Sequence, residues 1–197
     1  IYYEHQFGAL RRKNMATGKT VSIQPRADKG SPRLRFNWMT PFFLSHDDSK
    51  TVYCGANRLF KSTDRGDSWR AISPDLSHRP KEQGNVPYGT LTSLSESTMA
   101  KGMIYAATDD GRVHLTRNDG ADWACIDAGL PDIWVSRVRA SQHAKDRVFV
   151  TLTGYREDDF TSYVYRSEDA GLNWTAIPPG LPSESVNVIA EDPANAD

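Results

Sequence analysis

Short runs of alternating apolar and polar residues occur along the whole chain, and this two-residue period is typical of β-strands with one buried face. The clearest runs come in pairs that are separated by a turn or a loop. The pairs are 51–54 with 58–61, 103–106 with 112–115, and 147–150 with 163–166. The pattern therefore predicts an all-β chain of short strands joined by frequent turns.

A motif ending in tryptophan follows each pair. It holds Ser or Thr, then Asp or Asn two residues on, Gly after two more, and Trp after three more. Its members are Ser62, Asp64, Gly66 and Trp69; Thr116, Asn118, Gly120 and Trp123; and Ser167, Asp169, Gly171 and Trp174. The tryptophans lie 54 and 51 residues apart. This period fits one four-stranded blade of a β-propeller.

The residue types of this motif suit a hairpin turn. The Asp or Asn side chain accepts hydrogen bonds from backbone N–H groups, and the Ser or Thr hydroxyl adds another. Gly adopts a positive φ at little steric cost, and Trp packs its ring across the turn. We therefore expect the twelve motif residues to be structural and not catalytic.

One further apolar run precedes each pair, at 41–44, 91–94 and 135–138. Each unit then has strands A, B, C and D, with the motif between C and D. The runs 2–5, 9–12 and 20–23 fit strands B, C and D of another unit, and 186–190 fits its strand A. The fold class predicted is a β-propeller of about four blades of four antiparallel strands. The blades are approximately 1–24 plus 186–197, 36–72, 90–126 and 134–177.

The split of one blade between the chain ends leaves three arrangements open. The terminal strands close a four-blade ring, or they belong to a segment of a larger propeller, or two copies form an eight-blade ring. We favour the segment, because strand sequence begins at the first residues of the chain. The expected partners are then the remaining blades of a parent protein, or a second copy.

Composition and charge remove several classes of function. The formal net charge is −1, with 24 basic and 25 acidic residues, so nothing in the charge favours nucleic acid or an anionic membrane as partner. The sequence contains no run of 18 apolar residues, so it does not predict insertion into a membrane. Cys54 and Cys125 occupy different positions in different repeats, and we expect them to be unpaired.

Cofactor and metal motifs do not occur in the sequence. The five histidines lack the spacing of metal ligands, and there is no Gly-rich phosphate loop. A calcium site at 157–159 is an unspecific alternative. We therefore expect neither a cofactor nor a bound metal.

The repeated motif resembles the Asp-box, or bacterial neuraminidase, repeat. The stretches 35–41, 53–69, 134–138 and 154–160 resemble a glycosyl-hydrolase-like branch of large bacterial proteins related to the ten-bladed sortilin-type receptor domain. The resemblance implies a propeller in a secreted protein, located outside the cell or in the periplasm. It leaves the activity open, because Asp-box propellers include sialidases, xyloglucanases, photosystem assembly factors and sorting receptors.

Propeller topology places the D–A and B–C loops together beside the channel mouth, on the face opposite the motif turns. We expect ligand contacts on that face from Trp38, Arg58, Trp134 and Arg156, and the ligand to be a glycan, a peptide or a protein. For the two tryptophans the alternative is packing between blades.

A basic run at Arg26, Lys29, Arg33 and Arg35 lies in a loop that contains Gly and Pro. We interpret this run as a solvated connector between blades. A contact of this loop with further parts of a larger protein is the alternative.

Four carboxylates are candidates for glycoside hydrolysis, which needs two carboxyl groups about 5–9.5 Å apart. They are Asp109, Asp110, Asp158 and Asp159. Adjacent aspartates are also common turn formers. A sialidase is disfavoured, because the chain lacks the Arg-Ile-Pro sequence that carries the first arginine of the sialidase triad.

We therefore predict a non-catalytic binding module of a larger exported protein. The alternatives are a sialidase- or xyloglucanase-like glycoside hydrolase domain, and a scaffold whose active residues lie elsewhere.

Overall fold

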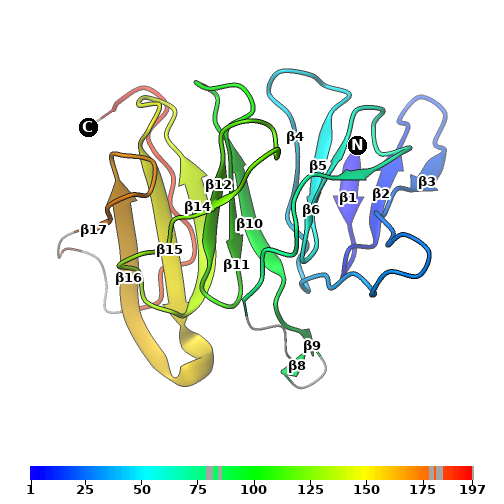
Figure 1. The fold of residues 1–197 in the computed structure, drawn as a ribbon. Coiled ribbons are helices and arrows are strands. Elements are labelled where there is room, and N and C mark those ends of the chain that lie inside the picture. The colour runs from blue at the N-terminus through cyan, green and yellow to red at the C-terminus, as the bar shows by residue number, and fades with distance from the viewer. Residues whose placement is uncertain (79–81, 84–85, 178–179, 181–183, 197) are drawn as a thin grey trace. The chain divides into compact units, whose positions relative to one another are not determined.

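In the computed structural model the chain forms two compact units, Ile1–Leu91 and Thr92–Asp197. Nearly all of the regular structure is β-strand (Figure 1). The described residues are 1–78, 82–83, 86–177, 180 and 184–196.

The N-terminal unit contains two antiparallel sheets and a short hairpin. The first sheet consists of β1 (Tyr2–Glu4), β2 (Leu10–Lys13) and β3 (Thr20–Ser22). The second consists of β4 (Phe42–Leu44), β5 (Val52–Gly55), β6 (Leu59–Ser62) and β7 (Arg70–Ala71). The hairpin pairs β8 (Glu82–Gln83) with β9 (Val86–Pro87).

The C-terminal unit holds two four-stranded sheets. The first is β10 (Leu91–Glu96), which starts one residue before the unit, β11 (Ile104–Thr108), β12 (Val113–Thr116) and β13 (Ala124–Cys125). The second is β14 (Trp134–Ala140), β15 (Val148–Gly154), β16 (Asp159–Ser167) and β17 (Thr175–Ala176). The 3₁₀ turn η1 (Tyr155–Glu157) joins β15 to β16. Strands follow chain order within every sheet, as in propeller blades. The predicted all-β propeller fold class is confirmed.

The structure differs from the sequence prediction at 186–190, the segment that was expected to supply strand A of the first sheet. This segment forms no strand, and the sheet of β1 has three strands. Residues 186–191 instead lie along β14 and the turn after it. The Ser136 hydroxyl donates to the Val186 carbonyl oxygen at 3.4 Å, and the Ser141 hydroxyl donates to Glu191 at 2.6 Å. Serine side chains on and just after β14 thus hold a segment that the apolar pattern alone assigned to a sheet.

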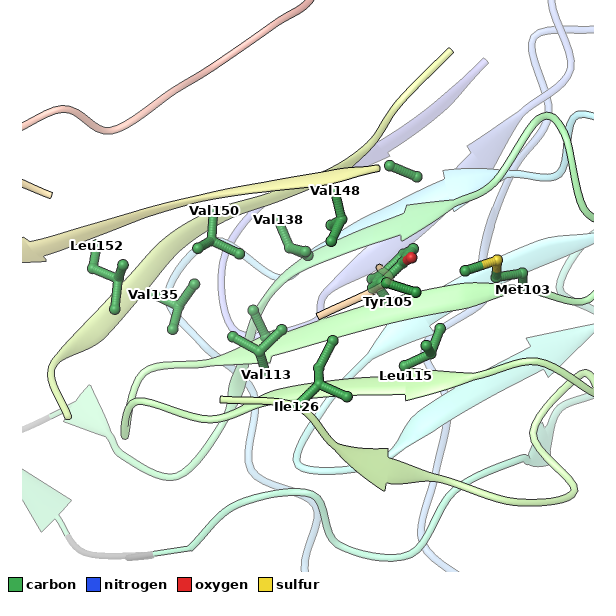
Figure 2. Close-up of a cluster of buried hydrophobic side chains, with 13 residues drawn as sticks. Met103, Tyr105, Val113, Leu115, Ile126, Val135, Val138, Val148, Val150 and Leu152 are labelled. Atoms are coloured by element: carbon green, nitrogen blue, oxygen red, sulfur yellow. The ribbon is translucent and has the colours of Figure 1, made fainter. Parts of the chain in front are cut away.

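The core of the C-terminal unit lies between its two sheets. Figure 2 shows Tyr105 and Val113 of one sheet near Val138 and Val150 of the other. These four residues are at most 1% exposed. Fully burying an aliphatic side chain such as Val113 or Val138 stabilises the fold by about 1.5–3 kcal/mol, so the facing apolar surfaces contribute much of the free energy that holds the two sheets together.

Buried serines of β10 satisfy the backbone of β14. The Ser93 hydroxyl accepts the N–H of Val138 at 3.1 Å, and the Ser95 hydroxyl accepts the N–H of Ala140 at 2.9 Å. An unpaired buried N–H would cost free energy comparable to a lost hydrogen bond. The two serines therefore explain why polar residues occupy buried positions of this strand.

The repeated motif forms the same hydrogen-bonded turn in each of the three four-stranded sheets. In the first turn the Ser62 hydroxyl accepts the N–H of Gly66 at 2.7 Å and donates to Asp64 at 2.7 Å. The Asp64 carboxylate accepts the N–H of Ser68 at 2.8 Å. Thr116 and Asn118 make the matching contacts in the second turn, and Ser167 and Asp169 in the third.

The turn also attaches to the A–B turn of its own sheet. Arg65 and Gly66 have φ values of 65° and 91°, and the Arg65 N–H donates to the Lys50 carbonyl oxygen at 2.8 Å. Equivalent bonds join Asp119 to Gly102 and Ala170 to Asp146. The A–B and C–D turns therefore share one edge of each sheet.

Within each unit the turn links two neighbouring sheets. The Trp69 indole N–H donates to the carbonyl oxygen of Ile23, just after β3, at 2.8 Å. A Cβ on Gly66 would lie 2.8 Å from the Ile23 side chain. In the C-terminal unit Trp174 binds the carbonyl oxygen of Ile126 at 2.7 Å. The motif glycine thus allows the close approach, and the tryptophan fixes it.

The residue four positions after the Asp or Asn complements that residue. Asp64 accepts from the Ser68 hydroxyl, and Asp169 accepts from the Asn173 amide at 2.7 Å. The middle turn has the opposite polarity, because the Asn118 amide donates to the Asp122 carboxylate at 2.9 Å. Where the motif has Asn in place of Asp, the residue four positions later is therefore the hydrogen-bond acceptor and not the donor.

We predict that the first and third turns make the fold sensitive to acid. Hydrogen bonds from Ser68 and Asn173 lower the pKa values of Asp64 and Asp169 from the usual 3.8 to about 2. A pKa lower in the folded than in the unfolded state gives stability that is present above pH ~4 and is lost as the pH falls towards 2. An Asp64→Asn, Asp169→Asn variant is expected to lose less stability between pH 4.5 and 2.5, measured by urea unfolding. An acid loss equal to that of the native chain would contradict this assignment.

We also predict that Asn118→Asp destabilises the middle turn, because it places a second carboxylate against Asp122. The expected loss is ~1 kcal/mol, or about 2–4 °C in Tm for a chain of this size. Adding Asp122→Asn restores a donor and is expected to recover most of the lost Tm. Thermal unfolding of the two single variants and the double variant measures the coupling, and additive effects would refute complementarity.

Candidate functional site

The start of β14 and the turn between β15 and β16 lie at the same edge of their sheet. Trp134 pairs with Thr153, and Gly154 pairs with Asp159. The loop 155–158 therefore lies beside Trp134, at the edge where the D–A and B–C connections were expected to meet.

Arg156 and Trp134, two of the predicted ligand contacts, touch each other. The Arg156 guanidinium carbon lies 3.8 Å from the centre of the Trp134 ring. Tyr155 is 64% exposed and Phe160 is 50% exposed, and their rings pack edge to face with centroids 5.8 Å apart. We call these four residues, Trp134, Tyr155, Arg156 and Phe160, the hairpin platform.

The backbone below the platform permits only a narrow set of residues. A Cβ on Gly154 would lie 2.7 Å from the Cβ of Asp159, so glycine is needed where the strands shift register. Asp158 has a φ of 57°, a left-handed value that Asp tolerates better than most residues. The Asp159 carboxylate accepts the Thr161 N–H at 2.9 Å and the Tyr163 hydroxyl at 2.8 Å. These bonds position the turn.

The four candidate carboxylates lie in the turns of two different sheets. Asp109 and Asp110 are 0% and 1% exposed, and Asp110 accepts the Thr108 hydroxyl at 2.6 Å. Asp158 is exposed, while hydrogen bonds from Thr161 and Tyr163 lower the pKa of Asp159. Burial keeps the first pair from solvent, and Asp159 is held in its ionised form.

The other two predicted ligand contacts lie in the N-terminal unit. Trp38 is 47% exposed, and its ring meets Phe7 edge to face at 5.1 Å. Arg58 is half-buried, and its Nε donates to the Ser73 carbonyl oxygen at 2.9 Å. The structure therefore brings Trp134 and Arg156 together, whereas Trp38 and Arg58 occupy separate positions of the other unit.

Arg58 lines a cleft of about 390 Å³ between the loop 26–35 and residues of β6 and β7, among them Phe60 and Ala71. Part of the basic run lies here too. Arg35 is not a solvated side chain as we had interpreted it: it donates to the Gly89 carbonyl oxygen at 3.1 Å and pairs with Asp75 at 2.7 Å. Arg26 and Arg33 line the same cleft with exposed side chains.

The two cysteines are free thiols, Cys54 buried and Cys125 exposed. Desolvation of the thiol by its neighbours and a hydrogen bond to the Asp127 carboxylate raise the pKa of Cys125 to about 11. A thiol with that pKa is protonated at neutral pH and is a poor nucleophile. Across the described part of the chain, no three His, Cys, Asp or Glu side chains group as metal ligands would.

Tyr155 and Phe160 were not among the predicted contact residues. Two aromatic residues in a polar insertion were an available signal, but sequence alone did not distinguish an exposed pair from one folded back into the core. The cleft was not predicted, because a basic loop that contains Gly and Pro is more often only a connector.

Comparisons with known proteins support the fold. No family model and no curated protein matches the chain. A GH74 xyloglucanase from Xanthomonas campestris matches with 15% identity and a TM-score of 0.52, over 87% of this chain and 23% of that one. An extracellular domain of a protein described as a hybrid two-component system, from B. thetaiotaomicron, matches with 13% identity and a TM-score of 0.50, over 94% of this chain and 21% of that one.

A third solved structure, "YCF48 bound to D1 peptide", matches with 18% identity and a TM-score of 0.47, over 73% of this chain and 42% of that one. The chain spans less than half the length of each of these three proteins. Likeness at such low identity shows the fold alone. Among the residues that the structure describes, no helix has the length and apolar character needed to cross a bilayer.

Proposed function

We propose that the chain is a non-catalytic binding module, and that the hairpin platform binds an extended peptide with an acidic residue beside an apolar one. The observation that carries the proposal is the Arg156 guanidinium stacked 3.8 Å over Trp134, in a hairpin that also carries two exposed aromatic rings. We further propose, from the Asp-box resemblance, that the chain belongs to a larger exported protein.

Arg156, which lies on the Trp134 ring, is oriented to bind an anion. A guanidinium that lies on an indole uses its face for the ring, while its N–H donors lie in its plane and suit a planar carboxylate. No hydrogen bond or ion pair joins Arg156 to any other residue in the described ranges. The ring contact also limits its rotamers, so less entropy is lost when a ligand binds.

The two exposed aromatic rings supply the apolar part of the site. Tyr155 and Phe160 present apolar area on a turn that Gly154 and Asp159 hold in place. Rigid aromatic side chains give large contact area at low entropic cost, and Tyr, Trp and Arg are common at the energetic centres of interfaces. A sugar ring would compete with Arg156 for one face of Trp134, so the geometry favours a peptide over a glycan.

Hydrolysis is less well supported than binding. A glycoside hydrolase needs one carboxyl group that stays protonated near neutral pH and a second carboxylate across the bond. Asp109 and Asp110 are buried, and the hydrogen bonds that Asp159 accepts lower its pKa. These properties favour binding without turnover.

We predict that labelled peptides of the type acetyl-Leu-Asp-Phe-amide bind the chain, and that the Asn counterpart binds about tenfold more weakly, because a charge-assisted hydrogen bond is worth about 1.5–3 kcal/mol. Arg156→Ala is expected to reduce affinity about tenfold, and Arg156→Lys to restore only part of it, since ammonium lacks the planar fork. Fluorescence anisotropy measures each dissociation constant.

Arg139→Ala is the matched control, because Arg139 is also an exposed arginine and lies on β14, the strand that begins at Trp134. It should leave affinity unchanged. Equal binding of the Asp and Asn peptides, or full affinity in Arg156→Ala, would overturn the proposal. Turnover of a xyloglucan oligosaccharide that is lost in Asp158→Asn would establish the hydrolase alternative.

A further inference from the structure

The cleft of the N-terminal unit has the dimensions of a small-molecule site. Its volume of about 390 Å³ lies within the range of about 300–1,000 Å³ typical of such pockets. One wall is the loop 26–35, and the other is formed by Phe60, Trp69 and the segment 74–75. All of these residues belong to one compact unit.

The charges that line the cleft are unbalanced. Four arginines face it against two aspartates, Asp28 and Asp75. Asp75 is already neutralised, since it pairs with Arg35 at 2.7 Å and accepts the Asn57 amide at 2.8 Å. The three arginines that remain, Arg26, Arg33 and Arg58, face a single acidic side chain.

Arg58 is positioned in advance of any ligand. Its Nε donates to the Ser73 carbonyl oxygen at 2.9 Å, which orients the guanidinium of a half-buried side chain. No described residue accepts a hydrogen bond from its two terminal nitrogens. A guanidinium held by one N–H keeps a fork of donors that matches carboxylate and phosphate oxygens.

The walls of the cleft add an apolar surface. Phe60 is 5% exposed and packs in the core, and Trp69 is fixed by its bond to Ile23. Arg26 and Arg33 are exposed and make no hydrogen bond or ion pair with the described residues through their side chains. An aromatic wall beside exposed cations suits a ligand with an apolar body and an anionic end.

We propose that this cleft binds a small organic anion, whose carboxylate or phosphate group is held by Arg58 with Arg26 and Arg33, and whose apolar body lies against Phe60 and Trp69. The site is separate from the hairpin platform, which belongs to the other unit. The proposal does not depend on the function proposed for that platform.

Isothermal titration of the full chain with phenyl phosphate and with phenylacetate tests this assignment. Both are expected to bind at least tenfold more tightly than inorganic phosphate and acetate, which lack the ring, and than phenol, which lacks the charge. The tighter of the two ligands shows whether the native anion is a phosphate or a carboxylate. Quenching of tryptophan fluorescence should accompany binding, because Trp69 lines the cleft.

Arg58→Gln is expected to weaken phenyl phosphate binding at least tenfold. Because Arg58 is half-buried, Arg33→Gln provides a second test on an exposed side chain, with an expected loss of about threefold or more. Arg11→Gln, an exposed arginine of β2 outside the cleft, is the matched control and should bind as the native chain does. Phenyl phosphate that binds no better than inorganic phosphate, or equal affinity in all three variants, would overturn the proposal.

Discussion

The hydrogen bond from a motif tryptophan to the backbone of the preceding sheet is the contact on which the rest of the structure depends. Trp69 and Trp174 make it to Ile23 and Ile126 at 2.8 and 2.7 Å. The motif glycine packs directly on the same isoleucine, which leaves no room for a Cβ. One eight-residue turn therefore closes its own hairpin and also fixes how closely two neighbouring sheets approach each other.

The two edges of each sheet therefore have different roles. The edge with the motif turns stabilises the fold, and the opposite edge carries the side chains proposed to bind ligands. The carboxylates of Asp64 and Asp169 in the motif turns accept hydrogen bonds from the side chains of Ser68 and Asn173. These two acids therefore serve the structure of the turn and not catalysis. At the opposite edge, the connections carry side chains that the fold does not need for itself. Arg156 stacked on Trp134, and Arg58 bonded through one nitrogen, are both held in place while donors remain available.

The strands, the turns and the edge that carries the platform could be predicted from sequence, because period, turn chemistry and chain order act locally. The segment 186–190 forms no strand although its apolar pattern predicts one, because side-chain hydrogen bonds of Ser136 on β14 and of Ser141 just after it hold the segment, and no strand pattern records such bonds. Burial of Asp109 and Asp110 is likewise a tertiary property. The arginine cleft could not be predicted, because it depends on the ion pair between Arg35 and Asp75. That pair occupies one cation of the basic run, while Arg26 and Arg33 of the same run line the cleft.

Hydrogen exchange of the indole N–H groups, followed by NMR, tests the central contact most directly. Trp69 and Trp174 donate to backbone carbonyl oxygens, whereas Trp38 is 47% exposed. The indole protons of Trp69 and Trp174 are predicted to exchange at least about tenfold more slowly than that of Trp38, because exchange requires the two linked sheets to separate. Exchange of all three at the same rate would contradict the claim that these bonds join the sheets.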